Sequence, residues 1–402
     1  METAADLPAH LQGLKLFQPL QRFFDQLRRI KAHPNRSHFL DDHLLFLLLA
    51  YYNPAISGLR QLIALPLHKH VAGNLGLHRT SLGSFSEASS VFDPEPIRKI
   101  FLELSDQAKA LNGPRRPDGL PPGLNILAAD ASLWKLLPRM VHSLYQQPRT
   151  RARGGELKAH FIFNVLDHVP VDVELTDGKM DERHILPLQI ETGGIYILDR
   201  GYLSQQLWRG ILAAQSSFVA RLKLNTAYNV LETLPLSDMA HAAGVISDER
   251  VQISKPGQAP LTLRVVRAKK VCQPSRNLNP KHKRGKHAAP EKKATEHELI
   301  LLTDRFDLDA VEVVALYNYR WQIEVFFRWF KCVMKCRHLF AETQNGMALQ
   351  IYAALIASLL VVIYTSRKPT KQLLFLLQGY LRDDLDWEHV EAEIARSKPA
   401  KP

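Results

Sequence analysis

The amino-acid sequence predicts an α/β fold in which helices precede and follow a mixed sheet. Three observations predict this class. Residues 14–113 carry leucine-rich segments with helical spacing, and residues 125–224 alternate short apolar runs with polar turns. Long helical patterns return between about residues 311 and 378. A sheet with helices packed on it accounts for all three.

The first region, residues 1–113, contains a candidate DNA-binding motif. Helical patterns over residues 54–65 and 79–92 are separated by a connection that contains glycines. Such a pair fits a helix-turn-helix, whose second helix enters a groove of DNA. We therefore predict a helical N-terminal DNA-binding domain. An ordinary helical packing module fits the same pattern equally well and is the alternative. Residues 114–124, rich in proline and glycine, predict a linker.

The α/β core is predicted in two parts, residues 125–224 and 299–365, around a β-rich basic insertion over 225–298. Eleven Lys or Arg residues lie between Arg264 and Lys293 against a single acid. The basic tract 281–293 fits a contact with target DNA or a solvated loop. Residues 366–402 predict a helical C-terminal region with a basic tail.

The overall charge favours a polyanionic partner. The formal net charge is +12 and the isoelectric point is about 9.5, which is typical of nucleic-acid binding. Three cysteines fit a reducing compartment rather than a disulfide framework, and the N-terminus lacks the pattern of a signal peptide. The apolar stretch Ile351–Tyr364 is short for a membrane span and predicts a buried core helix. We expect a cytoplasmic, nucleoid-associated protein with no membrane partner.

Two aspartates end apolar runs of the predicted core. Asp130 follows LNILAA, and Asp199 follows GGIYIL. A carboxylate where a buried strand emerges is held rigidly and suits a hard cation such as Mg²⁺ or Mn²⁺. Taken alone, each aspartate is explained as readily by a turn or a helix cap.

A third carboxylate, Glu324, lies in the pattern LYNYRWQIEVFFRWFKCVMKC. At about 100° per residue, one continuous helix would gather six polar side chains within a stripe about 80° wide. These are Tyr317, Arg320, Glu324, Arg328, Lys331 and Lys335. A solvated helix face with an ion pair between Glu324 and Arg328 would explain the stripe by itself.

The three carboxylates together suit phosphodiester chemistry. Two divalent ions, one activating the attacking hydroxyl and one stabilising the leaving oxygen, can be held by three acidic side chains. Arginine and lysine along the helix would bind nearby phosphates, and Tyr317 could hydrogen-bond to one. Cys332, Cys336 and His338 lack a further ligand for zinc and predict no metal site.

The spacing of Tyr317, Arg320, Glu324 and Lys331 resembles the Tyr-Arg-Glu-Lys signature of bacterial DDE transposases of the insertion-sequence-four type. The blocks AADAS and LDRGY resemble the acidic blocks of that family, and GGELKAHFIFN, with Lys158 and His160, resembles the strand after the first aspartate. The resemblance covers residues 120–365, and SFSEAS is similar more loosely. It implies an RNase H-like core with a β-rich insertion and a dimeric synaptic complex on double-stranded DNA.

The resemblance also implies roles for individual residues. Asp130, Asp199 and Glu324 would bind the metal, normally Mg²⁺ with Mn²⁺ as a substitute. The expected DNA-binding residues are Tyr317, Arg320, Lys331, Arg328, Lys335 and Arg200, the last also supporting the second carboxylate. The expected function is binding of terminal inverted repeats, metal-dependent cleavage and strand transfer. A nuclease that does not join DNA and a catalytically silent DNA-binding protein are the alternatives.

Overall fold

The computed structural model describes residues 15–30, 38–53, 56, 58–65, 77–112, 119–136, 155–254, 256–271, 296–381 and 384–396. The chain forms two compact units, each assembled from segments that are distant in sequence. Unit 1 contains residues 1–118, 128–185 and 321–402, and unit 2 contains residues 119–127 and 186–320. This division differs from the boundaries expected from the sequence, because the N-terminal and C-terminal helices share one unit.

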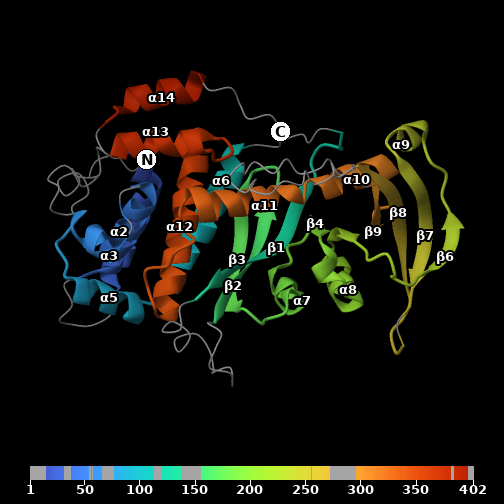
Figure 1. The fold of residues 1–402 in the computed structure, drawn as a ribbon, viewed down its shortest axis with the longest axis horizontal. Coiled ribbons are helices and arrows are strands. Elements are labelled where there is room, and N and C mark those ends of the chain that lie inside the picture. Colours follow the sequence, from blue (N-terminus) through green and yellow to red (C-terminus); the bar gives the residue numbers. More distant parts are fainter. Residues whose placement is uncertain are drawn as a thin grey trace, which may run out of the picture. The chain divides into compact units, whose positions relative to one another are not determined.

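Unit 1 is mainly helical (Figure 1). Its helices are η1 (Lys15–Leu20), α1 (Gln21–Arg29), α2 (Leu40–Tyr52), α3 (Leu59–Ile63), α5 (Leu82–Val91), α6 (Glu95–Asn112), α7 (Glu182–Ile185), α11 (Trp321–Arg328), the π-helix η7 (Trp329–Val333), α12 (Gln344–Thr365), α13 (Lys371–Leu381) and α14 (Trp387–Arg396).

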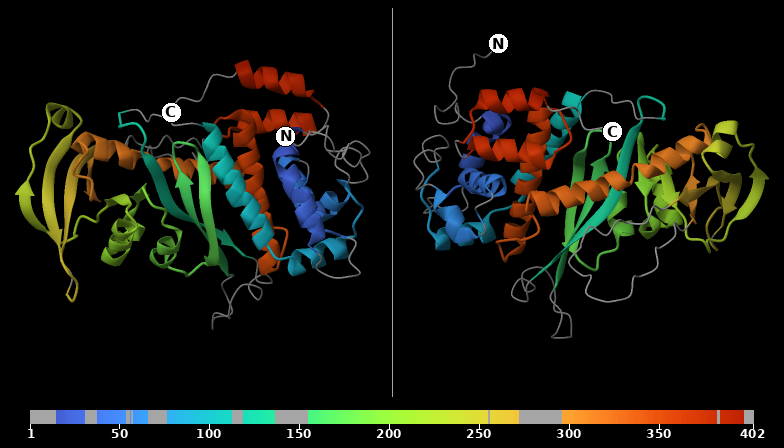
Figure 2. Two further views of the ribbon diagram at one scale, coloured as in Figure 1. Left: turned by 180° about the vertical axis from the view of Figure 1, so that it is seen from behind. Right: turned by 45° about the horizontal axis from the view of Figure 1, so that its top comes forward.

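Helix α12 forms the centre of unit 1. It is apolar on all sides, so it must be surrounded by other elements, and it packs against α2, α5 and α6 (Figure 2). The Tyr51 hydroxyl of α2 donates to the Gln350 carbonyl oxygen at 2.9 Å. Among the described residues, α12 alone is long and apolar enough to cross a membrane, and 94% of its most apolar window is buried. The prediction of a buried core helix is confirmed, although the helix starts earlier, at a Thr343 cap.

The strands of unit 1 follow the order β3-β2-β1. They are β1 (Asn125–Lys135), β2 (Glu156–Asn164) and β3 (Val169–Asp177). Strands β2 and β3 pair antiparallel, with His160 opposite Glu174. The first three residues of β1 belong to unit 2 and the rest to unit 1.

Unit 2 continues from β1 in the order β1-β4-β5-β9-β8-β7-β6. Its further strands are β4 (Gly194–Leu198), β5 (Ser217–Arg221), β6 (Asn229–Thr233), β7 (Val245–Ile253), β8 (Leu261–Val271) and β9 (Glu296–Thr303). Its helices are η4 (Leu186–Gln189), η5 (Arg200–Tyr202), α8 (Gln205–Ala213), α9 (Asp238–Ala242) and α10 (Ala310–Asn318). Strands β4 and β5 are parallel, and the remaining pairs from β5 to β6 are antiparallel.

These elements confirm the predicted α/β class. Helices come first, a mixed sheet follows, strands β6 to β8 extend that sheet beyond β9, and helices end the chain.

The insertion is anchored to the start of α10 by a buried ion pair. Arg264 of β8 and Asp248 of β7 are 5% and 3% exposed, and their nearest nitrogen and oxygen lie 2.6 Å apart. Arg264 also donates to the Leu308 carbonyl oxygen, just before the Asp309 cap of α10. Because a buried charge needs such partners, this network fixes where α10 begins.

The prediction of one continuous helix through the polar stripe is wrong. Helix α10 ends at Asn318, and the amides of Tyr319 and Arg320 bond to carbonyl oxygens only three residues back. After α11 the chain widens into η7, where the Met334 amide bonds to the Trp329 carbonyl oxygen at 3.0 Å. Both changes alter the rotation per residue about the helix axis. The angular positions calculated at 100° per residue are therefore not valid from Tyr317 to Lys335.

Candidate active site

Asp130 lies inside β1 rather than at the end of a strand, which corrects the sequence-based placement. Residues 126–129 are buried, and Asp130 and Ala131 are the first half-buried residues after them. Asp130 Oδ1 accepts a hydrogen bond from the Ala131 amide at 2.8 Å. The buried run therefore ends at Asp130, as the sequence indicated, but the strand itself continues to Lys135.

Asp199 directly follows β4, as predicted. Its Oδ1 accepts the Gly201 amide at 2.6 Å, so the side chain caps the short helix η5. The capping role considered from the sequence is therefore present. Asp199 remains half-buried at the edge of the sheet, whereas Arg200 is exposed.

Arg221 is a candidate site residue that the sequence analysis missed. In the parallel pair of β4 and β5, Leu198 lies opposite Ala220, so Asp199 and Arg221 follow at the same edge of the sheet. The Arg221 guanidinium lowers the pKa of the Tyr317 hydroxyl. The sequence did contain a signal for Arg221, because the apolar run SSFVAR ends in arginine just as GGIYILD ends in aspartate. A single sequence does not show, however, that these two strands are parallel neighbours.

Tyr317 and Arg320 complete this group in unit 2. Tyr317 is only 4% exposed, and burial raises the pKa of its hydroxyl. Arg320 and Arg221 lower that pKa, and Asp199 raises it, so all three charges act on the Tyr317 hydroxyl. Tyr317 thus remains a neutral hydrogen-bond donor next to two cations and one carboxylate.

Glu324 is positioned by an aromatic cluster in unit 1. Helix α11 and η7 present Phe326, Phe327 and Phe330 to Phe161 of β2, with ring centroids 5.8, 5.1 and 6.1 Å from it. This packing covers the apolar sides of α11 and leaves Glu324 half-buried.

Lys331 joins η7 to the strand that carries Asp130. Its ammonium lies 4.1 Å from the centroid of the Trp134 ring and donates to the Leu133 carbonyl oxygen. Burial lowers its pKa. The Trp134 indole nitrogen in turn donates to the Cys336 carbonyl oxygen at 2.6 Å. The strand that carries Asp130 is therefore tied to η7, which directly follows the helix that carries Glu324.

The other predicted basic residues occupy different environments. Arg328 is exposed at the end of α11. Lys335 lies beyond η7 with a left-handed φ of 57°, so it belongs to no helix and is not part of a stripe. Lys158 forms an ion pair with Glu182 at 2.8 Å.

The predicted metal ligands are divided between the units, with Asp130 and Glu324 in unit 1 and Asp199 in unit 2. In the described part of the chain no group of three or more His, Cys, Asp or Glu side chains could hold a metal ion. The donor chemistry fits a hard cation, because all three are half-buried carboxylates. The three-carboxylate metal site stays a prediction.

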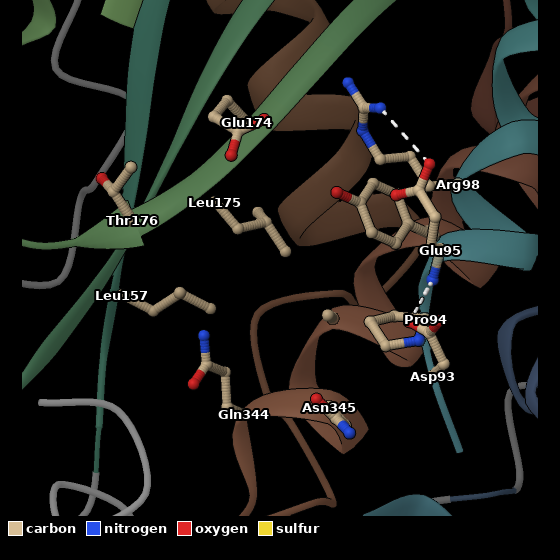
Figure 3. A pocket seen from close by; sticks show the side chains of 12 residues that line it. Asp93, Pro94, Glu95, Arg98, Leu157, Glu174, Leu175, Thr176, Gln344 and Asn345 are labelled. Carbon is tan, nitrogen blue, oxygen red and sulfur yellow. Dashed lines mark hydrogen bonds and ion pairs between the residues drawn. The ribbon is translucent and has the colours of Figure 1, made fainter. Parts of the chain in front are cut away.

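A pocket of about 270 Å³ elsewhere in unit 1 is lined by Glu95, Arg98, Glu174 and Tyr352, among others (Figure 3). Arg98 pairs with Glu95 at 3.8 Å and with Asp172 at 3.1 Å. Carboxylates outnumber the single arginine in this region, and burial raises the pKa of Glu174. The pocket is therefore unsuited to DNA, and none of the predicted site residues lines it.

Two predicted DNA contacts fall partly or wholly outside the described residues. The connection of the proposed helix-turn-helix, residues 66–76, and the basic tract 281–293 are among them. Helices α3 and α5 on either side of that connection touch each other, and α5 buries Phe85 and Ala88. Both the DNA-binding and the packing interpretation remain open.

The family model described as "Transposase DDE domain" matches residues 121–360, more than half of the chain. This chain belongs to that family. Asp130, Asp199 and Glu324 all lie within the matched residues, and the prediction of a DDE transposase is confirmed at the level of the family.

Three curated relatives are transposases by name. The chain is 31% identical over 216 residues to the putative transposase y4zB of Sinorhizobium fredii, covering 53% of this chain and 54% of that protein. It is 35% identical over 68 residues to the probable transposase for insertion sequence element IS5377 of Geobacillus stearothermophilus, covering 17% and 18%. It is 26% identical over 88 residues to the putative transposase for insertion sequence element IS4SA of Synechocystis, covering 21% and 26%. The match spans about half the length of the first relative and less of the others.

Among solved structures, the chain resembles the piggyBac transposase in its synaptic complex with hairpin DNA, determined by cryo-electron microscopy. The TM-score is 0.45 at 12% sequence identity, and the match covers 99% of this chain and 87% of that chain.

Proposed function

We propose that this protein is the transposase of an insertion sequence of the insertion-sequence-four type. It binds the terminal inverted repeats of its element, cleaves the DNA at the element's ends and joins the freed ends to a target. The proposal rests on the family membership and on the Tyr-Arg-Glu-Lys spacing of Tyr317, Arg320, Glu324 and Lys331.

The observation that carries the proposal is the group around Asp199. A carboxylate at the carboxyl edge of β4 lies beside Arg221, Arg320 and a neutral Tyr317. This combination suits phosphodiester cleavage, because the carboxylate suits a metal ion and the cations suit the charge that develops on the phosphate.

The carboxylates Asp130, Asp199 and Glu324 would hold divalent ions, Mg²⁺ or Mn²⁺. When bound, these ions lower the pKa of the attacking hydroxyl and stabilise the leaving oxygen. Asp130 is held by β1, Asp199 by the η5 cap, and Glu324 by the aromatic packing of α11. Each ligand is thus fixed by regular structure rather than by a loose loop.

The basic residues have distinct tasks in this proposal. Arg320 and Arg221 bind phosphate oxygens, and the Tyr317 hydroxyl donates to one. Lys331, because it rests on Trp134 and β1, also holds η7 in place for Glu324. The net charge of +12 attracts DNA before these contacts form.

The finer points of the proposal concern assembly and location. We expect a homodimer that pairs two element ends, acting in the cytoplasm on the nucleoid. Arg200 and Lys335 are expected to contact DNA outside the immediate site.

The test uses the purified full chain with DNA that carries the element's inverted repeats. Cleavage at the element's ends should require Mg²⁺ or Mn²⁺, and Glu324→Gln should abolish it. Glu342→Gln, which changes an exposed acid beyond η7, is the matched control and should retain cleavage. Full cleavage by Glu324→Gln would contradict the proposal, and metal-independent binding without cleavage would favour a silent DNA-binding protein.

A further inference from the structure

A basic side chain outside the matched family region is held against the helix that carries Glu324. Lys368 lies in the turn between α12 and α13. Ser366 ends α12 with a left-handed φ of 47°, and its amide bonds to the Val362 carbonyl oxygen at 2.7 Å. Thr370 accepts the Leu373 amide at 3.2 Å at the start of α13. The backbone of the turn is therefore fixed on both sides.

The contact with α11 is specific. The Lys368 ammonium donates to Gln322 Oε1 at 2.6 Å. Lys368 also lines a cavity of only about 20 Å³ together with Val325 and Trp329. A lysine stem packed on apolar side chains, with its ammonium fixed by an amide, presents its charge in one place.

Among the described residues, no carboxylate forms an ion pair with Lys368. Burial and the nearby Arg328 both lower its pKa, and neither influence is a carboxylate. Two other lysines of unit 1 differ, since Lys158 pairs with Glu182 and Lys109 pairs with Asp106, each at 2.8 Å. Lys331 is similar to Lys368, because its ammonium donates to the Leu133 carbonyl oxygen. An anion bound at Lys368 would offset both the burial of the ammonium and the repulsion from Arg328.

The position relative to Glu324 follows from the geometry of α11. Taking Glu324 as zero at about 100° per residue, Arg328 lies near 40° and Gln322 near 160°. Arg328 therefore lies between Glu324 and the Gln322 side that holds Lys368. On a helix about 11 Å across, the arc from Glu324 to Gln322 is about 15 Å, so Arg328 is the basic side chain nearer to Glu324 and Lys368 the one farther from it.

We infer that Lys368 and Arg328 form a phosphate-binding site for the DNA strand that reaches Glu324, with Gln322 as the residue that positions Lys368. The inference rests on the proposed function and extends the DNA path onto the turn after α12. The contact is to the backbone, so it adds affinity for DNA of any sequence.

The salt dependence of DNA binding tests this site. Each phosphate contact contributes about 0.9 to the slope of log K against log salt concentration on double-stranded DNA. Lys368→Gln should therefore reduce the slope by about 0.9, equally for DNA with and without the inverted repeats, while Lys368→Arg keeps the slope. Gln322→Ala should weaken binding with a smaller change in slope. Lys109→Gln, which removes a lysine already paired with an acid, should leave the slope unchanged.

A structural role for Lys368 predicts a different pattern, in which thermal unfolding shifts and the salt slope does not. An unchanged slope for Lys368→Gln, with a wild type that binds and cleaves the DNA, overturns this inference alone. A loss confined to DNA with the inverted repeats overturns it as well, because it would indicate contact with bases. If the wild type binds no DNA at all, both this inference and the proposed function are wrong.

Discussion

The ammonium of Lys331 lies 4.1 Å from the centre of the Trp134 ring, which ties the π-helix after Glu324 to the strand that carries Asp130. Trp134 is 3% exposed, and its ring meets Phe330 edge-on at 6.3 Å. One indole thus supports both the packing of η7 and the charge of Lys331.

Replacing this indole should be costly. We expect Trp134→Ala to lower the free energy of unfolding by about 3–5 kcal/mol, because a large buried side chain is lost and a cavity remains. Urea unfolding followed by circular dichroism measures the change. Trp321→Ala removes an indole that is 56% exposed and should cost no more than about 1 kcal/mol. Equal losses for the two variants would refute the supporting role of Trp134.

Arg221 should matter for cleavage although the family signature does not include it. Its effect on the Tyr317 hydroxyl and its position at the same sheet edge as Asp199 predict that Arg221→Gln slows end cleavage by about 10- to 100-fold, the effect of losing one charged hydrogen bond to a phosphate. Single-turnover cleavage at saturating metal measures the rate. Arg250→Gln, on β7 and half-exposed, should stay within about twofold of the wild type. Wild-type rates for Arg221→Gln would remove Arg221 from the site.

His160 should make the protein sensitive to acid. Burial, with a smaller effect of Lys158, lowers its pKa to about 4, and its Nε2 lies 2.8 Å from Thr176 Oγ1. Since the unfolded histidine titrates near 6.5, the unfolded state binds more protons as the pH falls from about 6.5 to about 4. Stability is therefore present at neutral pH and declines over that interval, by about 2 kcal/mol after allowing for solvent screening.

The pH dependence of His160→Gln provides the comparison. Glutamine preserves a hydrogen bond to Thr176 but does not titrate, so unfolding free energies measured between pH 7 and 4 should fall less steeply than in the wild type. A variant with the same slope as the wild type would show that another group causes the acid sensitivity.

Metal removal should separate binding from chemistry. Chelation with EDTA should abolish cleavage, and added Mg²⁺ or Mn²⁺ should restore it, because three carboxylates suit hard cations. DNA binding through Arg221, Arg320 and the other cations should persist in EDTA, as gel-shift experiments can show. Cleavage that survives chelation would contradict the metal-ligand assignment of the three acids.

The sequence predicted much of this architecture because its signals are local. The all-round apolar pattern of α12 and the apolar runs of β1 and β4 depend on neighbouring residues, and each appears in the structure. The environments of Asp130 and Asp199 followed from the same runs, although β1 extends past Asp130.

Features that depend on pairing or helix type could not be predicted in this way. Apolar periodicity does not distinguish an α-helix from the tight turn at Arg320 or from the π-helix that follows α11. The proximity of Arg221 to Asp199 requires knowing that β4 and β5 are parallel neighbours. Lys368 reaches Gln322 across 46 residues, a contact that no local pattern encodes.

Joining of DNA is the property that most directly tests the central claim, because a nuclease of the same fold would cut without joining. The measurement incubates the full chain and Mg²⁺ with a labelled, pre-cleaved element end and a supercoiled target plasmid. The proposed function predicts that the labelled 3′ end becomes covalently linked to the plasmid, and that Glu324→Gln forms no such product while Glu342→Gln does. Efficient cleavage without any joined product, or joining by Glu324→Gln, would contradict the account.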